Sequence, residues 1–108
     1  MISIDDFAKV NMAVGKIMSA EKMTDADKLL ILKVDFGEET PRQVISGIAL
    51  HFPSPEVLAG RKFIFVTNLE PRVIRGFESQ AMILAANTPE AFSLLEVGDN
   101  IPAGTTLK

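Results

Sequence analysis

Apolar side chains recur at every second position from Leu30 to Phe36, and the polar residues Lys33 and Asp35 stand between them. This period of two is typical of a strand that buries one face. Four other stretches are compatible with strands and are bounded by turn-forming residues: Asn11–Met23, Gln43–Ile48, Lys62–Asn68 and Ala81–Ala86. The pattern therefore predicts five strands.

Helical signals are short. Ser54, Pro55 and Glu56 combine a residue type common at an N-cap, a proline at the first helical position and an acid in the first turn. They predict a short helix over Pro55–Leu58. Ile4–Lys9 predicts a single helical turn with acidic residues near its start, as the helix dipole prefers.

Five strands with a small helix between the third and fourth predict an all-β fold. In the oligonucleotide/oligosaccharide-binding (OB) barrel, a five-stranded Greek-key sheet closes partly on itself. A small β-sandwich is the structural alternative. The placement of the helix, and the bulge or bend predicted at Gly15, favour the barrel. The length of 108 residues suits one domain, so we expect a single OB domain over residues 1–108.

Charge and composition narrow the class of protein. The formal net charge of −3 argues against a general polyanion binder, so folding has to assemble any basic face. The absence of cysteine excludes a disulfide framework, a thiolate zinc site and a cysteine nucleophile. No apolar run approaches the roughly 18 residues that cross a bilayer, and the N-terminus is acidic where a signal peptide is basic. We expect a cytoplasmic protein with no membrane partner.

The segment Asn68–Met82 holds the most informative chemistry. It follows the fourth predicted strand and carries Arg72 and Arg75 between a proline and a glycine turn. Each guanidinium presents a planar fork of donors, so two of them in one loop are suited to hold an anion. The alternative is that they are solvated charges or weak surface partners of Glu70 and Glu78.

The chain offers little for catalysis. His51 is the only histidine, and a metal site needs several ligands. A Ser-His-Asp arrangement would have to bring Ser46, His51 and Asp35 together, which their spacing does not indicate. Neither a phosphate-binding glycine loop nor a dinucleotide fingerprint is present. We therefore expect no enzyme, no cofactor, no metal and no small-molecule substrate.

Four motifs in order along the chain resemble the tRNA-binding domain family. They are Val14-Gly15-Lys16-Ile17 with Ala20-Glu21, Ala26-Asp27-Lys28-Leu29-Leu30 with Val34-Asp35, Arg42-Gln43-Val44-Ile45-Ser46-Gly47-Ile48-Ala49, and Asn68-Leu69-x-Pro71-Arg72 with Gly76-x-x-Ser79-x-x-Met82. That family includes stand-alone tRNA-binding proteins, the C-terminal domain of many methionyl-tRNA synthetases and a domain of an endothelial monocyte-activating polypeptide. The resemblance implies a module that grips tRNA by shape, near the outer corner of the L, and serves methionyl-tRNA synthetase.

Under this resemblance we expect two kinds of RNA contact. Cationic side chains contact phosphates or extend the positively charged surface. Polar side chains form hydrogen bonds to sugar or phosphate, or else they tie the loop to the barrel. The predicted tRNA-binding residues are Lys16, Lys33, Arg42, Asn68, Arg72, Arg75 and Ser79.

Three positions depart from the family pattern. The family often has basic residues where Ala13 and Val73 stand, and it usually has glycine where Ala81 stands. Two phosphate contacts are therefore missing. Each such contact changes the slope of log K against log salt concentration by about 0.7 for a single strand and about 0.9 for a duplex. We expect weaker tRNA binding than in a typical member.

The resemblance also implies a homodimer built from the N-terminal segment and the C-terminal tail. The apolar residues of these segments exceed what a lone barrel needs, and the predicted interface consists of Ile4, Phe7, Phe92, Leu94, Leu95, Val97 and Ile101. The alternative is that these residues merely cap the barrel ends.

Peptide binding is the alternative function. A small secretion-associated chaperone shares this fold and much of the pattern, and binds extended peptides in an apolar groove. Ala13 and Val73 favour it, because they replace charge by apolar surface. Ile45-Ser46-Gly47-Ile48 argues against it, because the chaperone's pattern has a serine-serine-alanine-glutamine run at these positions. We prefer tRNA binding.

Overall fold

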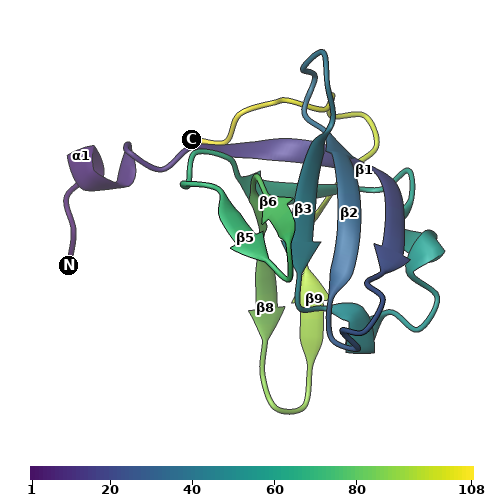
Figure 1. Cartoon of the computed structure of the whole chain (residues 1–108). Coiled ribbons are helices and arrows are strands. Elements are labelled where there is room, and N and C mark those ends of the chain that lie inside the picture. Colours follow the sequence, from purple (N-terminus) through teal and green to yellow (C-terminus); the bar gives the residue numbers. More distant parts are fainter.

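The strand predicted from the alternation is β2 (Leu30–Asp35), inside the main antiparallel sheet of the computed structural model, which describes all residues from Met1 to Lys108 (Figure 1). Strand β2 pairs with β1 (Met12–Lys22) on one side and β3 (Arg42–Ser46) on the other. The first part of β1 pairs with β4 (Lys62–Val66). The first four predicted strands are confirmed, with ends that differ by a residue or two.

The sheet curves back on itself through a few specific bonds. Strand β4 also pairs with two short strands, β7 (Met82–Ile83) and β10 (Glu96–Val97). On the other side, the Gln80 N–H donates to the Gln43 carbonyl oxygen, and the Gln43 N–H donates to Gln80 Oε1, both at 2.8 Å. These bonds join β3 to the segment before β7. The architecture is the predicted OB-type fold.

The barrel interior is filled by aromatic and branched side chains. Phe63 and Phe65 of β4 are fully buried, and Phe65 meets the Phe36 ring edge-on with centroids 5.2 Å apart. Gly15 of β1 lies against this cluster, so its side-chain-free position serves close packing. The prediction of a bulge at Gly15 is wrong, because the pairing with β4 is regular there and the register irregularity in β1 falls between Ile17 and Ser19.

The helix predicted after the third strand is the 3₁₀ helix η2 (Pro55–Leu58), which follows a further 3₁₀ turn, η1 (Ala49–His51). Leu58 is fully buried and anchors η2 to the barrel, whereas Ser54 makes no side-chain capping bond, contrary to expectation. The predicted N-terminal turn is α1 (Ile4–Phe7), which projects away from the barrel in Figure 1.

The fifth predicted strand, Ala81–Ala86, is wrong as a single strand. Its first part is β7, whereas β8 (Ala85–Asn87) leaves the sheet and forms a hairpin with β9 (Phe92–Leu94). The reason is that β7 and β10 share one edge of β4. Strand β7 pairs with Phe65 and Val66, and β10 occupies the part of the edge at Lys62 and Phe63. The segment after β7 therefore finds its partner in β9.

The C-terminal segment seals the edge of β1 that β2 leaves free. The Val14 N–H donates to the Thr105 carbonyl oxygen at 2.8 Å, and the Gly104 N–H donates to the Val14 carbonyl oxygen at 2.7 Å. The Leu107 N–H donates to the Met12 carbonyl oxygen at 3.0 Å. Covering this edge protects it from pairing with another chain. None of the helices has the length and apolar character of a membrane span.

Candidate nucleic-acid interface

The segment that carries the two predicted arginines is a β-hairpin rather than an irregular loop. Strand β5 (Arg72–Ile74) pairs with β6 (Phe77–Ser79), and Arg75 and Gly76 form the two-residue connection. Both connecting residues have positive φ, 53° and 83°, which is the pattern of the tight turns that suit the twist of a hairpin. We call the segment from Arg72 to Ser79 the cationic hairpin.

The cationic hairpin rests on the outer face of the barrel. Ile74 packs against a small buried cluster that includes Ile31 of β2 and Ile45 of β3, separate from the main core. In OB folds this face, together with the loops after the first and fourth strands, binds oligonucleotides and oligosaccharides. The hairpin therefore lies on the face that OB folds use for such ligands.

Arg72 and Arg75 are exposed, and neither guanidinium forms an ion pair with the nearby acids Glu70 and Glu78. Arg75 instead lines a hollow of about 470 Å³ together with Lys28 from the β1–β2 turn. Lys28 thus lies beside the hairpin turn. Asp25 and Asp27 line the same hollow and moderate its positive charge.

Ser79 and Asn68 are engaged inside the protein. The Ser79 hydroxyl is buried, accepts from the Ile45 N–H at 3.0 Å and donates to the Ala81 carbonyl oxygen at 3.2 Å. Asn68 Oδ1 accepts from the Asn11 N–H at 2.8 Å, and Asn68 Nδ2 donates to the Lys9 carbonyl oxygen at 2.7 Å. Of the two roles that the sequence left open, tying the loop to the barrel is the one these bonds perform.

We expect Ser79→Ala to lower the free energy of unfolding by about 1–3 kcal/mol, because the buried Ile45 N–H loses its partner. Urea denaturation measures this loss. The variant should keep the salt dependence of tRNA binding unchanged. A normal stability with a weakened complex would instead make the hydroxyl an RNA contact.

Arg42 joins the β2–β3 turn to the residues that follow β4 and β6. Its guanidinium donates to both carboxylate oxygens of Glu38 at 2.9 Å, to the Thr67 carbonyl oxygen at 2.7 Å and to the Gln80 carbonyl oxygen at 3.2 Å. The hydrogen bond to Glu38 raises the pKa of Arg42 and lowers the pKa of Glu38. The sequence did not indicate Glu38, because its pairing depends on how the β2–β3 turn folds back.

Lys16 and Lys33 lie on one outer face of the sheet, as the register places them. Lys33 Nζ donates to Gln43 Oε1 at 2.7 Å, and Gln43 Nε2 donates to the Glu78 carbonyl oxygen of β6 at 2.9 Å. This chain of bonds links β2, β3 and the cationic hairpin. Lys16 is half-buried and stands opposite Asp35.

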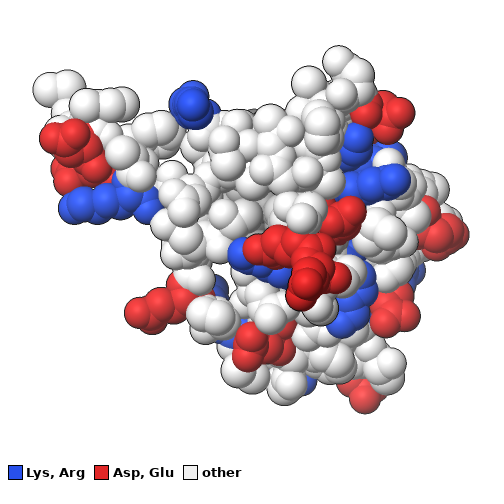
Figure 2. Space-filling view, turned by 90° about the horizontal axis from the view of Figure 1, so that it is seen from above, with Lys and Arg blue, Asp and Glu red and all other residues white.

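Positive charge is not spread over the whole molecule. Figure 2 shows Lys and Arg atoms in small separate groups, several beside Asp or Glu, with broad uncharged surface between them. On this face the charges are mixed, so the positive charge is local, as the net charge of −3 indicated.

The residues predicted to form a dimer interface divide into two sets. Ile4, 76% exposed, and Phe7 line an apolar hollow of about 480 Å³ between α1 and the C-terminal segment, together with Val10 and Leu107. Leu95 is exposed too. The others lie on the barrel: Leu94 belongs to the core, and Phe92, Val97 and Ile101 are half-buried.

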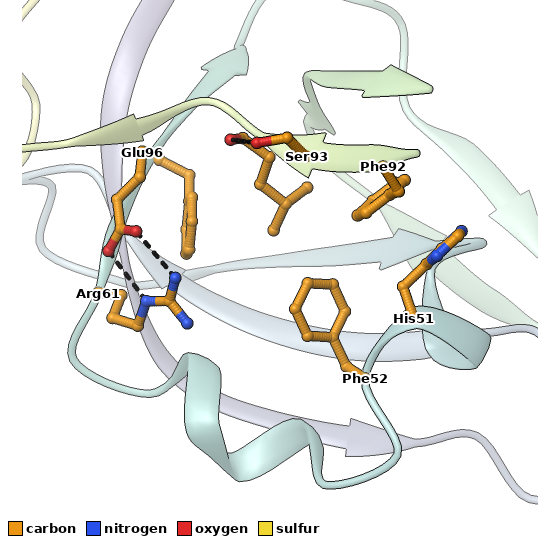
Figure 3. A pocket seen from close by; sticks show the side chains of 8 residues that line it. His51, Phe52, Arg61, Phe92, Ser93 and Glu96 are labelled. Carbon is orange, nitrogen blue, oxygen red and sulfur yellow. Dashed lines mark hydrogen bonds and ion pairs between the residues drawn. The ribbon is translucent and has the colours of Figure 1, made fainter. Parts of the chain in front are cut away.

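The only histidine lines a different hollow, of about 500 Å³, with no catalytic partner. The His51 ring stacks on Phe92 with centroids 3.8 Å apart and planes 6° apart (Figure 3). The Arg61 guanidinium and the Glu96 carboxylate bound the hollow and pair at 2.8 and 2.9 Å. Neither Ser46 nor Asp35 lines this hollow, and the hydroxyl of its Ser93 donates to the Leu94 carbonyl oxygen at 3.0 Å. No group of His, Cys, Asp and Glu is placed to hold a metal ion.

The fold and the cationic hairpin together define an OB-type domain with a local cationic surface. Residues 12–106 match the family model described as a putative tRNA binding domain. The chain belongs to this tRNA-binding domain family.

Curated relatives are considerably longer proteins. Methionine--tRNA ligase 1 of Bacillus anthracis is 51% identical over 107 residues, which are 99% of this chain and 16% of that protein. Methionine--tRNA ligase of Deinococcus radiodurans is 46% identical over 110 residues, again 16% of its length. The chain thus spans about 16% of the length of these relatives.

Two solved structures match this chain over nearly their whole length. The MetRS related protein from Pyrococcus horikoshii has a TM-score of 0.92 and 41% identity, covering 100% of this chain and 98% of that chain. The chaperone CsaA from Bacillus anthracis has a TM-score of 0.86 and 29% identity, covering 100% and 99%. The predicted family resemblance is confirmed, and the chaperone is a relative in fold.

Proposed function

We propose that this chain is a non-catalytic module that binds tRNA through the cationic hairpin. The observation that carries the proposal is the presence of two exposed guanidiniums, on Arg72 and Arg75, that no carboxylate engages. A guanidinium free of a protein partner offers its whole donor fork to a phosphate. Family membership supports tRNA as the polyanion.

The other predicted contacts take different places in this proposal. Lys16, Lys33 and Lys28 add positive potential around the hairpin without a fixed phosphate partner. Arg42, Asn68 and Ser79 act mainly within the domain, because internal hydrogen bonds already occupy their polar groups. The interface is then small, which agrees with the weaker binding expected from Ala13 and Val73.

Methionyl-tRNA synthetase is the proposed partner. The curated relatives are methionine--tRNA ligases that match this chain over 16% of their length. A tRNA-binding module, joined to the catalytic part or acting in trans, raises the local concentration of tRNA at the synthetase. We propose that this chain acts in the cytoplasm.

We further propose that two copies associate through the apolar N-terminal segment. Ile4 and Phe7 lie in an apolar hollow on a helix that projects from the barrel (Figure 1), and a lone domain leaves them in water. Phe7→Asp should therefore shift the protein from dimer to monomer in sedimentation velocity. Val57→Asp, an exposed apolar residue on η2, is the matched control. A wild-type chain that sediments as a monomer would refute the dimer.

Peptide binding stays the alternative, because the cationic hairpin also exposes the apolar side chains of Val73 and Phe77. Similarity to the chaperone CsaA supports it only at the level of fold. RNA should displace a bound extended peptide if one surface serves both ligands.

The test is a gel-shift titration with bulk tRNA at several salt concentrations. We expect a Kd on the order of 1 μM at low salt, and a log K that falls linearly with log salt by about 0.9 per duplex phosphate contact. Absence of a complex at the lowest salt would exclude tRNA binding and favour the peptide alternative.

A further inference from the structure

A small cavity opens beside Arg72, between the cationic hairpin and the end of β3. Its volume is about 130 Å³. Leu69, Ile74 and Met82 supply apolar walls, whereas Ser46, Glu70 and Arg72 supply polar groups. The sequence indicated Arg72 but not the cavity, because its walls come from three separate stretches of the chain, within residues 45–46, 69–74 and 79–83.

The size of the cavity selects its occupant. A cavity of about 150 Å³ with apolar walls holds one benzene ring, whereas drug-sized ligands occupy roughly 300–1,000 Å³. The cavity beside Arg72 therefore has room for about one planar ring. It is too small to hold several side chains of an extended peptide at once.

The charge beside the cavity selects the chemistry of the rest of the ligand. Arg72 lines the cavity, is exposed and has no carboxylate partner, so an anionic group joined to the ring can pair with it. The larger hollow in Figure 3 lacks this feature, because Glu96 already engages the Arg61 guanidinium that bounds it. A flat ring linked to a phosphate is the chemistry of a nucleotide.

We propose that this cavity receives one unstacked nucleobase of the bound RNA, while Arg72 holds the phosphate of the same nucleotide or its neighbour. The inference rests on the proposed function and gives it a specific contact. Proteins that recognise RNA loops commonly hold splayed-out bases against side chains and bond their polar edges. Leu69 and Met82 are each about half exposed, so their side chains are accessible to the faces of a base. Ser46 and Glu70 can bond to its edge.

The inference differs from phosphate binding in its consequences. A base in the cavity requires an unpaired nucleotide, so the protein should prefer RNA with an accessible loop to an uninterrupted duplex of equal charge. The apolar walls contribute affinity that salt does not screen, because salt acts on the phosphate contacts. The two contributions can therefore be separated by experiment.

The first experiment is an NMR titration of methyl-labelled protein with the four nucleoside 5′-monophosphates, with ribose 5-phosphate as the matched probe that lacks a base. We expect the nucleotides to shift the methyl resonances of Ile74 and Met82, and ribose 5-phosphate to leave them unchanged. Equal shifts from both kinds of probe would overturn the inference. Shifts from an extended apolar peptide but not from nucleotides would overturn it in favour of peptide binding.

The second experiment compares Leu69→Ala with Val57→Ala in tRNA titrations. Both residues are exposed and apolar, but only Leu69 lines the cavity, and Val57 lies on η2, outside the cationic hairpin. We expect Leu69→Ala to weaken binding about 5-fold or more, the low end of what one stacked base contributes, with an unchanged salt slope. Val57→Ala should bind normally. Equal affinities of the two variants would overturn the inference and leave tRNA binding intact, whereas no tRNA binding by the wild type would reject both.

Discussion

Replacing Arg72 and Arg75 together by glutamine is expected to weaken tRNA binding at least about 100-fold at moderate salt. Hydrogen bonds to charged groups contribute about 1.5–3 kcal/mol each, and this variant removes two sets of them. The slope of log K against log salt should also fall by about 1.4 to 1.8, according to whether the contacts are to single strands or duplex. Fluorescence anisotropy with labelled tRNA at several salt concentrations measures both quantities.

The control variant is Lys9→Gln with Arg61→Gln, which changes the net charge equally. Neither residue belongs to the cationic hairpin, and their ion pairs with Asp6 and Glu96 are at the surface, where such pairs contribute at most about 1 kcal/mol. The control should bind tRNA with nearly normal affinity. Equal losses in the two variants would mean that overall charge, and not the hairpin, governs binding.

Gly15→Ala is expected to lower the free energy of unfolding by about 3 kcal/mol, the upper part of the usual range for overpacking. A Cβ atom at this position would lie 2.5 Å from Val34 Cγ1, 2.7 Å from Phe36 Cε1 and 2.8 Å from Phe65 Cδ1. All three are side-chain atoms of the close-packed core, so relief requires several residues to move. Since domains are stable by only about 5–15 kcal/mol, this loss is severe. Urea denaturation followed by circular dichroism measures it.

Gly47→Ala is the matched control for Gly15→Ala. The nearest atom to a Cβ there is the Lys28 carbonyl oxygen at 4.0 Å, so the added methyl meets no clash. Its effect should be within about 1 kcal/mol and can be stabilising, because alanine restricts the unfolded chain. If both variants were equally stable, the close approach at Gly15 would not limit the packing of the barrel.

Much of the fold was predictable because its signals are local. The alternation along β2 and the proline at the start of η2 each depend on a few neighbouring residues. The fifth strand was not predictable in the same way. Ala81–Ala86 reads as one strand, yet it divides because β10, from ten residues further along, takes the adjoining edge of β4. Competition for a strand edge leaves no trace in the sequence of either segment.

The candidate site shows the same division. Arg72 and Arg75 were recognised from their residue type and turn context, and both are exposed on one hairpin. Arg42 and Ser79 were of equally suitable residue type, but their polar groups bond within the barrel. A residue's chemistry shows what it can bind, whereas its burial and neighbours decide whether it is available.

By itself, the sequence determined the family, the OB-type fold, the order of the first four strands and the two arginines of the cationic hairpin, because periodicity, turn residues and motifs are properties of neighbouring positions. Only the tertiary structure decided which cations remain unpaired, how β4 shares its edge and that a ring-sized cavity lies beside Arg72. These features arise from contacts between segments distant in the chain, so no local pattern encodes them.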